Sequence, residues 1–483
     1  MVVVVIALVA AGVAARTVPA LRQPLWLDEV VSARIITQPT VGKSVSQVRK
    51  TESSPPGWHL ANWALWRLVG KPSRLEWLRL LSVVLGGALT ALVVVYGLRV
   101  GLSRLGALVA GALAAFGPNV VAHGAELRPY AALTLLALVF AMVLERAAGS
   151  PTRRHLAWLT AVVVVGSYTH YFFLLSVATG IGWALWRLPK DVRLRVLGSI
   201  GVGLVPFLVW LPSFHYQYEH NLYAYNGSFS LRTVAYSYAR IVGLLGQAGA
   251  VDGLIRILFA VVVLAGAVML IRQRQGELAA LMVVVPVALT ALIWLLGPHI
   301  FNERNLLVSM PFAAVSVGKV FGQLPRPTMA VLLVALASVV AVSLWDWEVD
   351  YGRSSYDGIA KALTADGWQS NDEIVQFGPA PLGLSQPVGW YLPGQPRLTG
   401  AKLEACGPLF GVSYDGGAGD RWISGHLLSG AKVQMFRAYD HTPRGPSSSQ
   451  PIYVARLGGG LATAKRAIAS GARLIHAEGS SCG

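Results

Sequence analysis

The chain has 483 residues, of which 54% are hydrophobic and only 13% are charged, and its mean hydropathy is +0.55. This composition excludes an ordinary soluble protein and indicates a polytopic membrane protein. The formal net charge of +17 does not indicate a nucleic-acid partner. Lys and Arg occur in small groups between apolar runs, whereas a phosphate backbone needs a continuous basic surface.

Long apolar runs recur along the first 345 residues. A run of about 18 or more residues crosses a hydrocarbon core of about 30 Å, so the runs predict about eleven transmembrane helices. The first run is also compatible with a cleaved signal sequence, because it ends in small residues, although it lacks a basic N-terminal region. The predicted helices lie at roughly residues 2–20, 78–98, 105–122, 129–145, 155–169, 171–187, 194–212, 252–271, 278–297, 304–321 and 327–345.

Basic residues alternate along the connections between these runs and thereby predict the orientation. Connections on the cytoplasmic side of a membrane are enriched in Lys and Arg, and every second connection here is basic, beginning with Arg99 and Arg104. This pattern predicts a cytoplasmic N-terminus in the plasma (inner) membrane. It places residues 21–76, residues 213–251 and the tail after residue 345 on the extracytoplasmic side.

The chain therefore divides into a membrane module, residues 1–345, and an extracytoplasmic domain, residues 346–483. Within the first outer loop, residues 21–76, the stretches WLDEVVSARII and GWHLANWALWRLV predict short helices lying in the membrane interface. In the tail, SSYDGIAKALTADG is typical of a helix, whereas DEIVQFGP and PIYVARL are typical of strands, which predicts a small α/β domain. The only cysteines, Cys406 and Cys482, lie in this tail, where a disulfide between them is open.

Ionisable residues at the ends of the predicted helices gather on the extracytoplasmic side, which favours a shared polar cavity over residues that are polar only because helix ends are hydrated. Asp28 suits a general base, with Glu29 beside it. Arg79 and Arg304 are placed to bind a phosphate, although either suits an interfacial anchor equally well. The predicted cavity side chains are Glu126, Arg128, Tyr130, Tyr168, His170, Tyr171, His215 and Tyr218.

Two further patterns remain open at the level of the sequence. Glu126 and His170 could bind a divalent cation (Mg, Mn, Ca or Zn), although no closely spaced ligand motif is present. The stretch FHYQYEHNLYAYNGSF, residues 214–229, suits either a platform for sugar rings or an interfacial aromatic belt.

The order of several motifs resembles the membrane glycosyltransferases of the GT-C fold. The motifs are WLDE, SPPGWHL, LRLLSVVLGGALTALVVVYGL, ELRPYAALTLLAL, YTHYFFLL and ERNLLVSMPFAAV, and together they cover roughly residues 20–345. The chain is most similar to bacterial relatives of protein O-mannosyltransferases and of the aminoarabinose transferase that modifies lipid A. No single motif is specific, so the resemblance depends on their succession.

The resemblance implies transfer of a sugar from a polyprenyl-phosphate donor to an acceptor glycan, lipid or protein on the outer face. By resemblance, Asp28 activates the acceptor hydroxyl and Glu29 supports it, Arg79 and Arg304 contact the donor phosphate, and Glu126 and His170 face the same cavity. The chain departs from many relatives at SPPGW, where Ser54 stands in place of a His before the prolines.

The residues fit an inverting displacement, because one well-placed carboxylate suffices as the base and no second is needed as nucleophile. No Gly-rich phosphate loop is visible, so no nucleotide cofactor is expected. The composition, rich in Ala, Val, Gly and Arg, is typical of a bacterium with a high-GC genome, in which mannose and arabinose are plausible donor sugars. One alternative is a transporter or flippase, which internal repeats and helices broken by Gly or Pro would favour; the sequence shows neither. The second alternative is a non-catalytic protein that takes part in assembly of the cell envelope.

Overall fold

The computed structural model describes most of the chain. The described residues are 1–71, 74–220, 230–231, 234, 250–273, 275–297, 300, 302–350, 356–377, 385–400, 408–413, 418–437, 451–458 and 460–478. Cys406, Cys482 and most of the aromatic stretch 214–229 lie outside them, so the disulfide and the full aromatic platform stay predictions.

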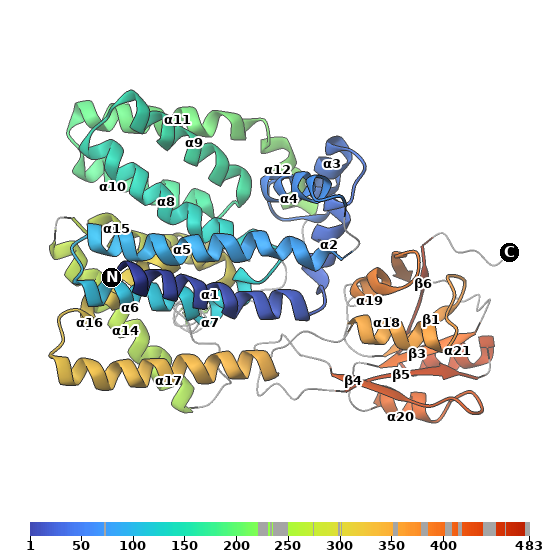
Figure 1. Cartoon of the computed structure of the whole chain (residues 1–483). Helices are drawn as coiled ribbons and strands as arrows, with labels where there is room; N and C mark the ends of the chain where they lie inside the picture. Colours follow the sequence, from blue (N-terminus) through green and yellow to red (C-terminus); the bar gives the residue numbers. More distant parts are fainter. Residues whose placement is uncertain are drawn as a thin grey trace. The chain divides into compact units, whose positions relative to one another are not determined.

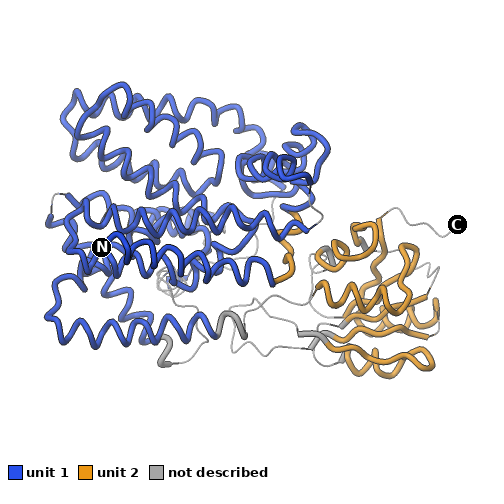
Figure 2. The backbone as a smooth tube through the Cα atoms, viewed as in Figure 1, with its two compact units in different colours: residues 1–22, 32–347 blue, residues 23–31, 348–483 orange. Residues whose placement is uncertain are grey.

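The chain forms two compact units (Figure 2). Unit 1 comprises Met1–Arg22 and Ser32–Trp347, and unit 2 comprises Gln23–Val31 and Glu348–Gly483. The sequence prediction divides the chain at residue 345 and does not separate Gln23–Val31 from the membrane module. This short segment belongs to unit 2 because the backbone N–H of Leu25 donates a 2.7 Å hydrogen bond to the Tyr391 hydroxyl, and Trp26 packs against the hydrophobic core of that unit.

Unit 1 is helical, and six of its helical segments are long and apolar enough to cross a membrane. Two bent pairs raise this number to eight within the described residues if each pair is one span. The expected count of about eleven is not confirmed, since three other helices have only 17, 15 and 12 residues. The six segments are Val2–Arg22 (α1), Leu75–Arg99 (η1, Leu75–Leu78, with α5, Arg79–Arg99), Tyr130–Gly149 (α8), Leu254–Arg272 (within α14, Ala250–Arg272), Glu277–Leu296 (α15) and Arg326–Trp345 (within α17, Arg326–Asp350). The three short helices are α9 (Arg153–Thr169), α10 (Phe173–Arg187) and α16 (Met310–Phe321).

The bent pairs correct one expectation, that no helix is broken by Gly or Pro. The helix α6 (Arg104–Phe116) meets α7 (Pro118–Gly124) at 48°, and α11 (Lys190–Leu208) meets α12 (Leu211–His220) at 63°. Gly117 and Pro118 cause the first break, because Gly117 has a non-helical backbone and proline cannot continue the backbone ladder. Pro206 lies inside α11, four residues before Trp210 at the second break.

Small residues allow the helices of unit 1 to pack closely. A Cβ atom at Gly106 in α6 would lie only 2.4 Å from the backbone oxygen of Gly318 in α16. Such close approach of two backbones is typical of membrane helices, where van der Waals packing replaces the hydrophobic effect. The ring of Tyr96 meets that of Phe312 edge-on at 5.9 Å within the same core.

Short helices form one part of unit 1, as Figure 1 shows for α3 (Val41–Thr51), α4 (Gly57–Leu68) and α12. The two stretches that predicted short helices both form them, as α2 (Leu27–Ile36) and α4. The amide of Gln217 in α12 donates hydrogen bonds to the backbone oxygens of Val48 and Ser54, which ties α12 to the end of α3.

Unit 2 contains the α/β domain expected from the sequence. Its six-stranded sheet has the order β2-β6-β1-β3-β5-β4, in which β1 and β3 are parallel and the other neighbours antiparallel. The stretches DEIVQFGP and PIYVARL form β1 (Glu373–Phe377) and β5 (Pro451–Leu457). The other elements are α18 (Tyr356–Ala365), α19 (Ser385–Tyr391), β2 (Leu398–Gly400), β3 (Leu409–Ser413), α20 (Ala418–Ser424), β4 (Gln434–Arg437), α21 (Gly460–Ala469) and β6 (Arg473–Ala477).

Candidate active site in unit 1

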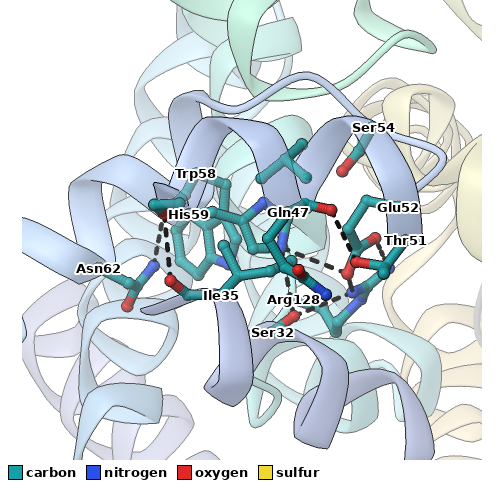
Figure 3. Close-up of polar contacts among 12 residues, drawn as sticks. Ser32, Ile35, Gln47, Thr51, Glu52, Ser54, Trp58, His59, Asn62 and Arg128 are labelled. Carbon is teal, nitrogen blue, oxygen red and sulfur yellow. Dashed lines mark hydrogen bonds and ion pairs between the residues drawn. The ribbon is translucent and has the colours of Figure 1, made fainter. Parts of the chain in front are cut away.

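A buried ion pair connects the segment after α7 with the end of α3 (Figure 3). The guanidinium of Arg128 donates two hydrogen bonds to the carboxylate of Glu52, at 2.6 and 3.0 Å. Both side chains are almost entirely buried. A bidentate pair of this kind fixes orientation as well as distance, so it sets the position of the segment that leads into α8.

Two further side chains complete this group. Arg128 also donates a 3.0 Å hydrogen bond to the Ser32 hydroxyl, and His59 of α4 lies with its Nε2 atom 3.3 Å from the Ser32 hydroxyl and 3.4 Å from Glu52 (Figure 3). Both Ser32 and His59 are fully buried. We call Ser32, Glu52, His59 and Arg128 the Glu52 cluster. It joins α2, α3, α4 and the segment before α8.

The Glu52 cluster is electrostatically matched. Burial alone would raise the pKa of Glu52, but the neighbouring Arg128 and then His59 oppose it and lower that pKa from its usual 4.5 to about 2. Glu52 is therefore ionised at neutral pH, and the guanidinium of Arg128 is committed to it. Arg128 is one of the predicted cavity residues, and its part in the structure is to hold the framework.

A second group surrounds Tyr130, the first residue of α8. Its ring lies 5.1 Å from the ring of His123 and 5.9 Å from that of His170, and the guanidinium of Arg304 lies 6.0 Å from its centre. Arg304 belongs to the short helix η3 (Glu303–Ser309), so four separate segments meet here. We call His123, Glu126, Tyr130, His170 and Arg304 the Tyr130 cluster.

His123 and Glu126 form a pair inside the Tyr130 cluster. The Nδ1 atom of His123 lies 3.2 Å from a carboxylate oxygen of Glu126, and the hydroxyl of Ser82 in α5 donates a 2.6 Å hydrogen bond to the Glu126 backbone oxygen. His123 also lines a small cavity together with Gly86, Gly124, Tyr130, Thr134 and Leu307. A carboxylate that orients an imidazole toward a cavity is suited to proton transfer.

His170 is a neutral member of the Tyr130 cluster. Burial, followed by the positive charge of Arg128, lowers its pKa from the usual 6.5 to about 3; Glu52 opposes this change and Arg304 adds to it. The Nδ1 atom of His170 accepts a hydrogen bond from the Phe172 backbone N–H at 3.2 Å, so the neutral ring carries its proton on Nε2.

The predicted cation site at Glu126 and His170 stays a prediction. Within the described part of the chain, no three His, Cys, Asp or Glu side chains lie close enough together to hold a metal ion. Nδ1 of His170 already accepts a hydrogen bond from the Phe172 backbone, and Nε2 carries the proton. The carboxylate of Glu126 is paired with His123. Both candidate ligands are thus already engaged by groups of the protein.

The two predicted phosphate ligands occupy different surroundings. Arg79 is fully buried at the start of α5 and donates a 2.8 Å hydrogen bond to the backbone oxygen of Ala20 near the C-terminal end of α1. Arg304 is only half-buried, beside the aromatic face of Tyr130. Both lie at the predicted extracytoplasmic ends of membrane helices, and their role toward a phosphate stays a prediction.

Asp28 and Glu29 lie in the first turn of α2, within the segment that belongs to unit 2. Glu29 is buried, and its carboxylate accepts a 3.3 Å hydrogen bond from the Trp26 backbone N–H at the start of the helix. Asp28 is half-buried. A carboxylate near the N-terminus of a helix interacts favourably with the helix dipole, so both residues suit the first turn of α2. Their catalytic roles stay predictions.

The remaining predicted side chains form a separate aromatic group around α12. Tyr171 accepts a 2.8 Å hydrogen bond from the indole of Trp210 and donates to Gln217, and Tyr168 donates to the Pro206 backbone oxygen. His215 is 70% exposed and pairs with Glu219, and Tyr218 is 51% exposed. Tyr168, Tyr171, His215 and Tyr218 therefore form hydrogen bonds or ion pairs around α11 and α12, or are exposed there, whereas the ring contacts described for Tyr130 involve His123 and His170.

Sequence reasoning missed four residues of these two clusters, namely Ser32, Glu52, His59 and His123. For His59 the sequence did contain a signal, because His59 belongs to the motif SPPGWHL. That motif was noted for Ser54, which stands where many relatives have a His. Glu52 follows KT at the end of a polar helix and is typical of a solvated charge. Only the fold shows that Arg128 covers it.

The comparisons with known proteins agree with this architecture at the level of the fold. No protein-family model and no curated protein matches the chain in sequence. Two solved structures of ArnT from Cupriavidus metallidurans are similar, each aligned over 93% of this chain and 97% of the other. The apo state gives a TM-score of 0.55 at 12% identity, and the state bound to undecaprenyl phosphate gives 0.50 at 13%. The chain is thus a multi-pass membrane protein with the fold of ArnT, the GT-C fold that its motifs resemble.

Proposed function

We propose that the protein is a glycosyltransferase that moves a sugar from a polyprenyl-phosphate donor to an acceptor hydroxyl at the extracytoplasmic face. The observation that carries the proposal is the ArnT fold over 93% of the chain, together with an ArnT structure bound to undecaprenyl phosphate. The Tyr130 cluster adds support, because it combines a cation, Arg304, with aromatic faces and a His–carboxylate pair at one place.

The proposed reaction is a single displacement. Asp28 removes the proton from the acceptor hydroxyl while its oxygen attacks the anomeric carbon of the sugar. The bond from that carbon to the phosphate oxygen breaks, and the electron pair leaves with the polyprenyl phosphate. The configuration at the anomeric carbon is inverted, because the attacking oxygen and the leaving oxygen occupy opposite faces. Glu29 supports Asp28 as its neighbour in the first helical turn.

Arg304 and Arg79 are proposed to stabilise the charge on the leaving phosphate. A guanidinium forms short, charge-assisted hydrogen bonds with phosphate oxygens, and these bonds strengthen as negative charge develops. His170 stays neutral in the Tyr130 cluster, so it contributes a hydrogen-bond donor at Nε2 without adding a further positive charge. Arg128 is paired with Glu52 and is proposed to hold the site together instead of binding donor.

The transporter alternative gains one observation from the structure, namely the two bent helix pairs. Broken helices at membrane depth are frequent in transporters, where their ends bind substrate. A flippase would move an intact polyprenyl-phosphate sugar across the bilayer and leave the bond to the phosphate uncleaved. The two functions are therefore distinguished by the chemical state of the donor after incubation with the protein.

Asp28→Asn tests the proposal. The full chain is reconstituted in nanodiscs with undecaprenyl-phosphate-linked radiolabelled mannose or arabinose and bacterial envelope extract, and label transfer is measured for wild type and variant. Loss of a general base lowers a rate by about 10²–10⁴-fold, so Asp28→Asn is expected to lose transfer by that factor. Asp191→Asn at the predicted cytoplasmic start of α11 is the matched control. A folded Asp28→Asn protein with wild-type transfer would contradict the mechanism.

A further inference from the structure

Arg16 is a fully buried arginine inside the membrane helix α1. None of the ion pairs found in the described part of the chain includes its guanidinium. A cation at this depth is costly unless polar groups surround it, so its presence needs a physical reason. Neither the sequence pattern nor the two clusters described above accounts for it.

The reason lies at the break between α6 and α7. Nη1 of Arg16 donates a 2.9 Å hydrogen bond to the backbone oxygen of Ala115 and Nη2 a 2.6 Å bond to that of Ala114, in the last turn of α6. In a continuous helix the N–H of residue 118 would occupy the Ala114 oxygen, but Pro118 has none. The Gly117 N–H satisfies only Leu113. Arg16 therefore supplies the donors that the broken helix lacks, as a membrane environment demands.

Three glycines make room for this side chain. A Cβ atom at Gly86 in α5 or at Gly124 in α7 would lie 2.7 Å from Nε of Arg16, and one at Gly12 would lie 3.2 Å from Nη1. Real Cβ atoms essentially never approach within 3.0 Å, so a side chain at Gly86 or Gly124 would require Arg16 to shift, while a Cβ at Gly12 would make a tighter contact than nine in ten real ones. The arginine is thereby held against α1, α5, α6 and α7 at once.

The direction of α7 decides where the candidate site lies. The chain leaves α7 at Gly124 and passes through Glu126 and Arg128 to Tyr130, and His123 lies in the last turn of α7. Gly86 and Gly124, which contact Arg16, also line the small cavity beside His123 and Tyr130. We infer that Arg16 is a positioning residue, which caps the broken helix α6 and so fixes the bend that places the Tyr130 cluster. The inference deepens the proposed function, and its activity test rests on that function.

A double-mutant design separates positioning from stability. Arg16→Met removes the donors and is expected to lower both the Tm and the rate of sugar transfer, the latter about 100-fold, as a displacement of about 1 Å in a site can cause. Pro118→Ala restores an N–H that can satisfy the Ala114 oxygen by continuing α6. The double variant is therefore expected to recover the wild-type Tm while transfer stays low, because the bend is lost. The affinity for undecaprenyl phosphate is measured by native mass spectrometry. It is expected to be about 10-fold weaker than in the wild type in both the single and the double variant.

The outcomes decide between the two roles. A double variant that recovers both Tm and undecaprenyl phosphate affinity would show that Arg16 is merely structural and would overturn the inference. A double variant whose Tm is not restored would contradict the capping of the Ala114 oxygen. If the wild type transfers no sugar from any donor, the proposed function fails, while the Tm and affinity measurements still decide the role of Arg16.

Glycine variants provide the matched control. Gly124→Ala places a methyl group 2.7 Å from Nε of Arg16 and is expected to reduce transfer and affinity in the same direction as Arg16→Met. Gly198→Ala in α11 meets nothing within 4 Å and is expected to leave both at the wild-type level. Equal behaviour of the two variants would contradict the proposed fit around Arg16.

Discussion

Arg128 and Glu52 lie 76 residues apart in the sequence, yet their side chains form a buried bidentate ion pair within unit 1. The pair joins the end of α3 to the segment that carries Glu126 and opens α8. Ser32 accepts a further hydrogen bond from Arg128, and Nε2 of His59 lies 3.3 Å from the Ser32 hydroxyl and 3.4 Å from the Glu52 carboxylate. The pair therefore helps to fix the position of α3 relative to the segment before α8.

The first prediction concerns the stability of this pair. Glu52→Leu leaves a buried guanidinium without its carboxylate, and breaking a buried pair in this way costs about 3–5 kcal/mol. The double variant Glu52→Leu with Arg128→Met removes both charges and is expected to recover most of that loss. The free energy of unfolding is measured by SDS-induced unfolding in mixed micelles.

The exposed pair of Asp357 and Lys361 in unit 2 serves as its control. Removal of an exposed pair changes stability by less than about 1 kcal/mol. A Glu52→Leu protein that loses no more than the Asp357→Ala control would contradict the importance of the buried pair.

The second prediction concerns acid. The pKa of Glu52 is lowered from 4.5 to about 2 in the folded protein, so its stabilising contribution is full above pH 4.5 and is lost as the pH falls toward 2. His170 affects stability at higher pH. Its unfolded form binds a proton below pH 6.5 but its folded form only near pH 3, so stability is lost as the pH falls from 6.5 toward 3. Thermal unfolding is measured at a series of pH values. Glu52→Gln is expected to lose the fall in Tm between pH 4.5 and about 2, and His170→Phe is expected to lose the fall in Tm between pH 6.5 and about 3. Unchanged pH profiles in both variants would contradict the burial of these groups.

The third prediction concerns the lipid phosphate. Arg304→Ala is expected to weaken binding of undecaprenyl phosphate about 10- to 100-fold, because a charge-assisted hydrogen bond contributes about 1.5–3 kcal/mol. The affinity is measured by native mass spectrometry in detergent. Arg326→Ala at the exposed, predicted cytoplasmic start of α17 should bind as the wild type does. If both variants bind equally, Arg304 does not contact the phosphate.

Much of the fold could be predicted from the sequence, because it depends on signals that are local. Apolar runs mark α1, α5, α8, α14, α15 and α17, and the stretches SSYDGIAKALTADG, DEIVQFGP and PIYVARL indicate α18, β1 and β5 of unit 2. The count of helices could not be predicted as well. A run of apolar residues does not show that Pro118 breaks one helix, or that α9 and α16 end after 17 and 12 residues.

The site was harder to predict than the fold. Glu126, Tyr130, His170 and Arg304 were expected in one cavity, and they do lie together around the Tyr130 ring, although their functional roles stay predictions. Glu52 and Arg16 were missed for a physical reason. Each has the local sequence of an ordinary charged residue or helix end, and its significance comes from partners about 76 to 99 residues away.

The central claim is that the protein cleaves the bond between a sugar and a polyprenyl phosphate and transfers the sugar. The most direct measurement follows undecaprenyl-phosphate-linked radiolabelled mannose and arabinose, in nanodiscs with purified protein and envelope extract, and quantifies both lipid and sugar products by mass spectrometry and radiometry. The account predicts that one of these donors releases undecaprenyl phosphate in equal amount to the sugar attached to acceptor, and that Asp28→Asn abolishes both. Recovery of intact donor in every case, with donor moved across the bilayer of proteoliposomes at the wild-type rate, would contradict it.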